Sequence, residues 1–140
     1  MTVIEFLNPD TVGAPAAAYS LGARVPAGAE YIFTSGIVAT GADGTTATDI
    51  SEQAEAIWNA IGEVLKAGGC SLDDLVGYTT YVVDRPDLNA DLTADLAKVM
   101  AVRDRVLAGR KPTSTLIVVP RLARAEWLLE IAAVAAKVPQ

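Results

Sequence analysis

The sequence predicts an α+β fold in which two helices cover one face of a mixed β-sheet. Two amphipathic segments alternate irregularly with β-branched and aromatic segments, in the order ββ(β)-α-β-α-ββ. Because strands and helices do not strictly alternate, this order favours a mixed sheet. The 140 residues, 51% of them hydrophobic, suffice for a single domain over 1–140. The second face of such a sheet is uncovered, so we expect oligomerisation to bury it.

The N-terminal part of the chain is rich in strand signals. Residues 3–7 are apolar and end at an Asn-Pro-Asp turn sequence, which predicts a first strand. Residues 19–25 alternate loosely up to Pro26, and residues 31–38 are β-branched and aromatic with a glycine in the middle. We expect these two segments to pair as a hairpin. The glycine-rich residues 41–44 then form a tight turn.

The first helix is predicted to follow Asp49. Apolar residues recur there at three- and four-residue spacing, as on one face of a helix. They are Ala54, Ile57, Ile61, Val64 and Leu65. Asp49 together with Glu52 suits a capped N-terminus, and Gly68-Gly69 suits a C-terminal stop.

The second half of the chain predicts strand, helix and two further apolar segments. Residues 75–83 have strand composition and end at an Asp-Arg-Pro-Asp sequence. A second helix is expected over residues 88–107, with apolar positions at Leu92, Leu96, Val99, Met100 and Val106. Residues 113–119 are β-rich, whereas the alanines of residues 127–134 leave strand and helix both open. Residues 120–124 are expected to form a turn between these two segments.

Composition excludes several classes of chemistry. The net charge of −6 provides no positive field for phosphates, so nucleic acid and anionic membranes are disfavoured partners. The absence of histidine removes the commonest metal ligand and the usual base of a hydrolytic triad. Cys70 is the single cysteine, so neither an intramolecular disulfide nor a thiolate cluster for a metal can form. We therefore expect no metal, no cofactor and a cytoplasmic setting.

The N-terminal segment, residues 1–10, lacks the layout of a secretory signal. It contains Glu5 and no basic residue before its apolar stretch. No apolar run reaches the roughly 18–20 residues that a membrane-spanning helix needs. We expect a soluble intracellular protein.

Four local phrases, in this order and spacing, give the chain a recognisable signature. They are Asn8-Pro9 with Tyr19-Ser20, then Phe33-Thr34-Ser35-Gly36, then Gln53 through Asn59 to Leu65-Lys66-Ala67-Gly68-Gly69, and finally Leu129-Glu130-Ile131. Over nearly its whole length the chain resembles the reactive-intermediate deaminase (Rid, YjgF-type) family. The resemblance implies a chorismate-mutase-like α+β subunit, a homotrimer, and small-molecule sites in the clefts between subunits.

The resemblance also implies roles for particular residues. Glu130 corresponds to a carboxylate that orients a water molecule for attack on a C=N carbon. Tyr19 corresponds to a tyrosine that lines the cleft, and Ser35-Gly36 to a backbone that a ligand can approach closely. Three other interpretations stay open: Glu130 as an exposed residue of an edge strand, Tyr19 as an interface or core aromatic, and Ser35-Gly36 as a β-bulge.

One departure from the family pattern concerns the substrate anchor. Family members that deaminate imines hold the substrate carboxylate with an arginine that follows a proline near the penultimate strand, and Ser114 occupies that position here. Ser114 and its neighbour Thr115 are candidate ligand contacts, but a hydroxyl carries no charge. Nearby cations are expected to face water, because burying a charge is costly. These cations are Arg110, Lys111, Arg121 and Arg124.

Other departures are small changes of spacing. The region between Asp84 and Pro112 is longer by a few residues than the family pattern, and one extra residue separates Leu122 from Glu130.

Two functions fit these observations. The first is a deaminase or hydrolase-like enzyme that adds water to a small imine, enamine or related electrophile in an intersubunit cleft, without a metal or cofactor. The second is a non-catalytic trimeric small-molecule-binding protein of the same fold, which the missing arginine favours. Ribonuclease activity, sometimes attributed to this family, fits poorly because the chain lacks histidine and a basic surface stripe.

Overall fold

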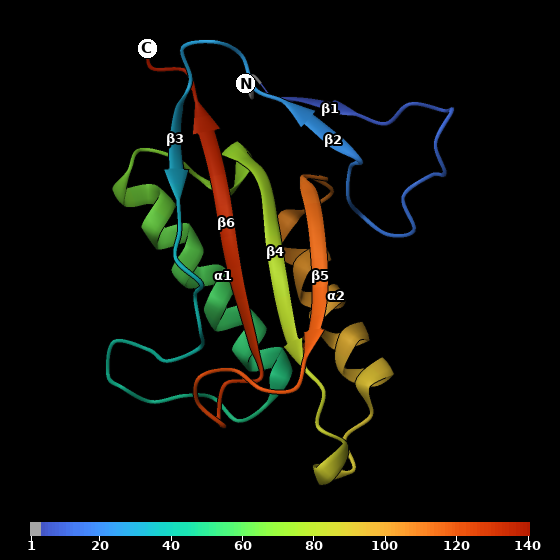
Figure 1. Ribbon diagram of the computed structural model, residues 1–140. Coiled ribbons are helices and arrows are strands. Elements are labelled where there is room, and N and C mark those ends of the chain that lie inside the picture. Colours follow the sequence, from blue (N-terminus) through green and yellow to red (C-terminus); the bar gives the residue numbers. More distant parts are fainter. Residues whose placement is uncertain (1–3) are drawn as a thin grey trace.

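A computed structural model of the chain describes residues 4–140 and contains a four-stranded sheet with strand order β3-β6-β4-β5 (Figure 1). The four strands are β3 (Glu30–Phe33), β4 (Leu75–Val83), β5 (Thr113–Val119) and β6 (Leu129–Lys137). β4 pairs in parallel with β5 and antiparallel with β6, and β3 is antiparallel to β6. The sheet is therefore mixed, and the predicted α+β fold class is confirmed.

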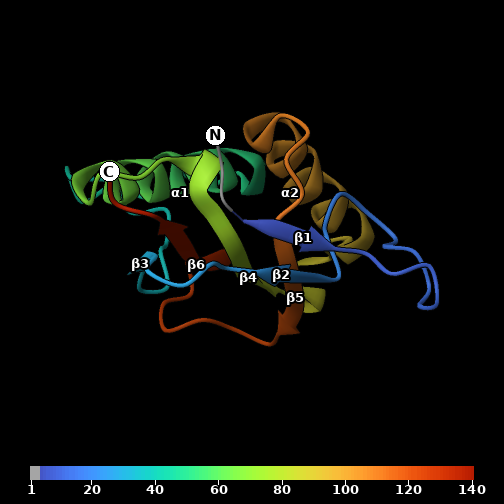
Figure 2. The ribbon, with the colours of Figure 1, turned by 90° about the horizontal axis from the view of Figure 1, so that it is seen from above.

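Helix α1 (Ile50–Ala67) forms where its pattern predicts and lies on one face of the sheet together with α2 (Leu92–Leu107) (Figure 2). The side chain of Asp49 accepts a hydrogen bond from the backbone N–H of Glu52, and the N–H of Gly68 closes the last turn. The helix buries one apolar stripe against the sheet. Its largest buried side chains are Ile57, Trp58, Ile61 and Leu65.

Helix α2 (Leu92–Leu107) begins four positions later than the sequence pattern predicts. Pro86–Leu88 forms a short 3₁₀ helix, η2, and Asn89 adopts a left-handed conformation that ends it. Asp91 then caps α2 by accepting from the N–H of Ala94. The start of the helix thus follows the cap rather than the first apolar residue. No helix within residues 4–140 is both long enough and apolar enough to cross a membrane.

The predicted hairpin between residues 19–25 and 31–38 is wrong. β2 (Gly22–Arg24) pairs with β1 (Glu5–Leu7) in a separate two-stranded sheet, while β3 pairs with β6. The side chain of Asn8 explains the choice, because it accepts from Leu21 N–H at 2.8 Å and so ties the two ends of this small sheet together. Residue 3, the start of the first predicted strand, lies outside the described residues.

The C-terminal apolar segment is a strand, which resolves the alternative that the sequence left open. In β6 the side chains of Leu129, Ile131, Ala133 and Ala135 point toward the helices and are buried. The two alanines among them have short side chains, which allow α1 to pack closely on the sheet. β4 lies between β5 and β6, so the loop that follows β5 crosses the end of β4 instead of forming a hairpin (Figure 1).

A buried glutamine joins α1 to the segment that enters β6. Gln53 is fully buried, and its Nε2 donates to the carbonyls of Ala47 and Glu126 at 2.7 and 2.8 Å. Its Oε1 accepts from the N–H of Leu128 at 2.9 Å. One amide side chain thus satisfies three backbone groups from two loops.

Replacing Gln53 with Leu is expected to lower the free energy of unfolding by about 1–3 kcal/mol, because the three backbone groups lose their buried partner. Chemical denaturation followed by circular dichroism measures the loss. Glu63→Gln, at an exposed position of the same helix, serves as the control and should change stability by less than about 0.5 kcal/mol. Equal stability of the two variants would contradict the structural role of Gln53.

Candidate functional site

The sheet face opposite the helices is open in the described chain (Figure 2). Residues paired across neighbouring strands point to the same face, so the register defines rows of side chains on it. The rows are Ile117-Tyr81-Glu130, Thr115-Thr79-Ala132 and Thr113-Gly77-Val134-Phe33. The single carboxylate in these rows is Glu130.

The middle of this face is hollowed because its residues are small. Gly77, Thr79 and Ala132 form the floor of a depression of about 440 Å³, and Phe33 and Thr115 belong to its lining. This volume falls in the range of small-molecule sites. Of the predicted ligand contacts, Thr115 therefore borders a hollow of suitable size.

Ser35 and Gly36 bring the chain close to Glu130. Thr34 forms hydrogen bonds with Ala133, and Ile37 forms hydrogen bonds with Ile131. The two residues between them, Ser35 and Gly36, therefore lie opposite the single residue Ala132. This extra residue is the mark of a β-bulge, one of the interpretations that the sequence left open. A Cβ at position 36 would overlap the carboxyl group of Glu130, so only glycine leaves room for it. Two predicted site residues, Gly36 and Glu130, are thus in contact, with Ser35 exposed beside them.

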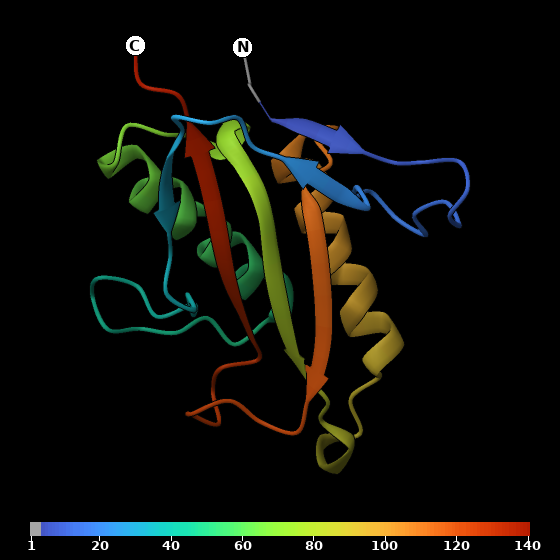
Figure 3. The same ribbon diagram turned by 45° about the horizontal axis from the view of Figure 1, so that its top comes forward.

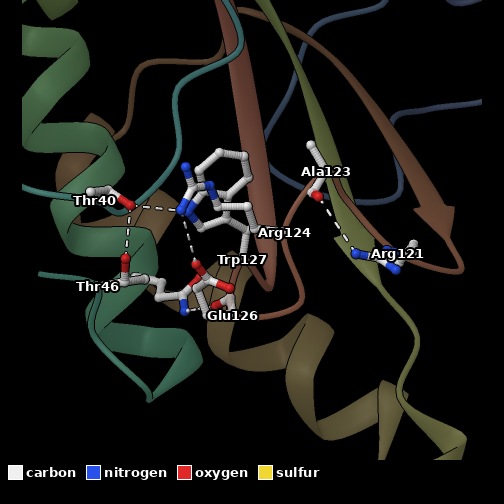
Figure 4. A network of polar contacts seen from close by, with 8 residues as sticks. Thr40, Thr46, Arg121, Ala123, Arg124, Glu126 and Trp127 are labelled. Carbon is white, nitrogen blue, oxygen red and sulfur yellow. Dashed lines mark hydrogen bonds and ion pairs between the residues drawn. The ribbon is translucent and has the colours of Figure 1, made fainter. Parts of the chain in front are cut away.

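The loop before β6 is held by a network of polar contacts (Figure 4). Trp127 Nε1 donates to the hydroxyl of Thr40 at 3.0 Å, and that hydroxyl lies 2.7 Å from the hydroxyl of Thr46. The guanidinium of Arg124 stacks over the Trp127 ring at 5.5 Å and lies 3.9 Å from the carboxylate of Glu126. These contacts, together with Gln53, fix the point at which β6 begins.

Ser114 lies on the other face of the sheet. It is paired with Tyr78, whose side chain points toward the helices, and it contributes to a small cavity beneath the sheet. The N-terminal segment runs beside the start of β5 (Figure 3), where Ser20 forms a bridge with Thr113. Tyr19 precedes this bridge, and its Oη accepts from the N–H of Ala16 at 3.3 Å. Within one chain, the structure therefore does not bring Ser114 to Glu130.

The cations next to Ser114 in the sequence are held elsewhere, as expected of surface residues. Arg110 pairs with Asp73, and Lys111 is exposed. Arg121 donates hydrogen bonds to carbonyls of its own loop, and Arg124 stacks on Trp127. Sequence reasoning missed a different arginine, Arg103 of α2, which is buried and lines the same small cavity as Ser114. A signal for it exists, because Arg103 continues the apolar spacing of Leu96 and Val99.

Cys70 is a poor candidate nucleophile. Burial raises the pKa of its thiol, and the nearby carboxylate of Asp74 raises the pKa further. The thiol is therefore protonated near neutral pH. No cluster of metal-ligating side chains occurs in the part of the chain that the structure describes.

The family model for endoribonuclease L-PSP matches residues 11–137. The chain belongs to this family. This is the Rid or YjgF family that the sequence motifs indicate, so the predicted resemblance is confirmed.

Several solved structures share this fold. YyfB, a Rid-family protein from Yersinia pestis, is 28% identical, with 96% of this chain and 98% of that chain covered and a TM-score of 0.81. YEO7 from yeast is 24% identical with a TM-score of 0.66, over 96% and 98% of the two chains. A YjgF/YER057c/UK114 family member from Mycobacterium tuberculosis is 23% identical with a TM-score of 0.60, over 86% and 87%. No curated protein matches the chain.

Gly36→Ala is expected to displace the carboxyl group of Glu130, because the new methyl group occupies its place. The overlap involves the end of a flexible side chain, so the free energy of unfolding should fall by only about 1 kcal/mol. A crystal structure of the variant reports the position of Glu130. Gly13→Ala is the control, since a Cβ there meets nothing within 4 Å. An unmoved Glu130 in the Gly36 variant would contradict the close contact.

Proposed function

We propose that this Rid-family protein is a homotrimer that adds water to a small imine, enamine or related electrophile in the clefts between its subunits. The observation that carries the proposal is the contact between Gly36 and the carboxyl group of Glu130 on the open sheet face, where Ala132, the next residue of β6 on that face, lines the hollow. A carboxylate next to bare backbone, with room for a ligand, is an arrangement suited to holding a water molecule for attack.

The exposed apolar side chains on the open face support assembly. Phe33 is 71% exposed, and its ring stacks on Tyr31 with centroids 6.1 Å apart. Ile117 is exposed on the same face at the other side of the sheet. Large apolar side chains exposed at both edges of one sheet face support an interaction site there, and a second copy of the same sheet has matching chemistry.

The edge strand β5 supports a subunit contact as well. Leu116 and Val118 are exposed on its helix side, and Ile117 is exposed on its open side. Beyond the bridge between Ser20 and Thr113, no strand of the described residues covers its outer edge. An apolar edge strand invites pairing or coverage by another chain.

Assembly also explains why the candidate site residues are separated within one chain. Ser114 lies on the helix side of the sheet, and Glu130 lies on the open side. In a cleft between subunits, the β5 edge of one copy, with Ser114 and the neighbouring Tyr19, meets the open face of the next copy, with Glu130. The site is then complete only in the trimer.

The proposed reaction needs no metal or cofactor. Glu130 accepts a proton from a water molecule as the water oxygen bonds to the C=N carbon, and it passes this proton to the nitrogen. The hydroxyl of the adduct then gives its proton to Glu130, which transfers it to the nitrogen as the carbon–nitrogen bond breaks. The products are ammonia and a carbonyl compound, and Glu130 returns to its charged form.

A non-catalytic trimeric small-molecule-binding protein is the second candidate. The uncharged Ser114 favours it, because β5 lacks the charge that would anchor a substrate carboxylate. For the same reason we expect weak or absent turnover of the imines derived from serine and threonine. The endoribonuclease activity in the family's description is not favoured for this chain, which carries a net charge of −6 and no histidine.

The trimer predicts a mass of three times 14.6 kDa in light scattering at micromolar concentration. Phe33→Glu places a charge on the open face and should shift the mass toward that of one chain while the melting temperature of the isolated chain remains measurable. Leu88→Glu changes an equally exposed apolar residue in η2, away from the sheet, and should leave the mass unchanged. A stable monomer of the unmodified protein would rule out the proposal.

Glu130→Gln keeps the size of the side chain but removes the base, so turnover should fall by roughly 100-fold or more. The assay measures ammonia and carbonyl release from a panel of small imines, after light scattering has verified the assembly of each variant. Glu63→Gln, exposed on α1, is the matched control with full turnover expected. Unchanged turnover of the Glu130 variant would remove it from the mechanism, and absence of turnover in the unmodified protein on every imine would favour the binding protein.

A further inference from the structure

A second, buried site candidate lies between the helices and the sheet. Polar groups from α1, α2, β4 and β5 surround a cavity of about 10 Å³, the space open to the centre of a water-sized sphere. They belong to Trp58, Tyr78, Thr80, Arg103 and Ser114. A cavity of this size holds about one water-sized atom group.

One of these side chains has a polar atom without any partner within residues 4–140. The indole Nε1 of Trp58 is buried and unpaired, whereas the phenol oxygen of Tyr78 lies beside the guanidinium of Arg103; the two residues are 1% and 6% exposed. Their rings pack edge to face with centroids 5.1 Å apart, which holds both groups in place. Buried polar groups are almost always bonded, so the unpaired indole N–H points to an occupant.

Arg103 brings a positive charge to the same cavity. The residue is 6% exposed, and its Nε and Nη2 both donate to one oxygen of Asp104, at 3.0 and 2.8 Å. Asp104 itself is half-exposed, so it is a weak partner for a buried cation, and Nη1 has no carboxylate partner in the described chain.

The guanidinium keeps its charge. Burial alone would lower the pKa of Arg103, but the hydrogen bonds to Asp104 and the nearby oxygen of Tyr78 outweigh this effect and raise the pKa above its ordinary value. The cavity therefore carries a permanent positive charge at any physiological pH.

The donor set determines which occupant fits. An indole N–H and a guanidinium can only donate hydrogen bonds, and the hydroxyls of Tyr78, Thr80 and Ser114 can donate as well. A group that accepts several hydrogen bonds and carries negative charge matches both the donors and the charge. We propose that this cavity binds a small anion, with a single atom of it, one oxygen of a carboxylate or phosphate or a chloride ion, inserted among Trp58, Tyr78 and Arg103.

The cavity lies close to the protein surface. Ser114 and Leu116 belong to the edge strand β5, and Leu116 is partly exposed. The remainder of a carboxylate ligand can therefore extend outward along β5 while one oxygen stays inside. This site uses the helix side of the sheet, so it does not depend on the reaction proposed for Glu130.

Trp58 provides a direct readout. The chain has two tryptophans, and Trp127→Phe leaves Trp58 as the single tryptophan, which is excited selectively at wavelengths that tyrosine does not absorb. In this background, sodium formate, acetate, chloride and phosphate are titrated separately, with ionic strength held constant by the sodium salt of a bulky morpholinosulfonate buffer. We expect a saturable change in Trp58 fluorescence. Saturation by formate and acetate alone identifies a carboxylate ligand, and saturation by chloride or phosphate identifies an inorganic anion.

Variants test the assignment. Arg103→Gln should weaken the affinity by about tenfold or more, and Tyr78→Phe, which removes one oxygen, should weaken it by a smaller factor without unfolding the chain. Arg105→Gln, an exposed arginine two positions away that pairs with Glu55, is the matched control with unchanged affinity. The absence of saturation with all four anions would mean that the cavity holds water only and would overturn the proposal. If the Tyr78 and Arg103 variants both bind the anion as tightly as the unmodified protein, the proposal is also overturned.

Discussion

The three hydrogen bonds of Gln53 determine where strand β6 begins, and the arrangement of the candidate site depends on that point. Gln53 holds the carbonyl of Glu126 and the N–H of Leu128, immediately before the strand. Successive side chains of a strand point to opposite faces, so a shift of one residue would turn Glu130 toward the helices. Its carboxylate would then be buried without a partner, at a cost of several kcal/mol. One neutral amide in the core thus keeps the acidic group on the open face.

The sequence predicts those elements whose causes are local. The cap at Asp49, the apolar spacing and the glycine stop at Gly68 define α1, and residues 75–83 coincide with β4. The pairing of strands cannot be predicted in this way, because each strand pairs with a segment that is distant along the chain. The side chain of Asn8 joins β1 to the segment before β2, whereas β6 supplies the partner of β3, and no local pattern near residues 19–38 reveals either contact.

The candidate site, too, is only partly predictable from the sequence. The phrase around Glu130 indicates a catalytic carboxylate only through resemblance, because composition alone is equally compatible with an exposed glutamate. Its contact with Gly36 depends on the bulge opposite Ala132, which the sequence leaves as one of two alternatives. Arg103 has a local signal, its place on the apolar stripe of α2. Long arginines often extend from such stripes to water, so the pattern alone does not indicate burial.

The sheet keeps the two charged candidates apart. Glu130 lies on the open face and forms no ion pair within residues 4–140, while Arg103 lies beneath the opposite face. A cation beside Glu130 in the same chain would stabilise its charged form and weaken it as a base. A carboxylate beside Arg103 other than the half-exposed Asp104 would compete with any anionic ligand. Separation by one layer of β-sheet avoids both effects. In the proposed trimer, the β5 edge of one chain meets the open face of another, and only there do the two groups approach each other. Under that proposal, assembly controls which charges a ligand meets at the same time.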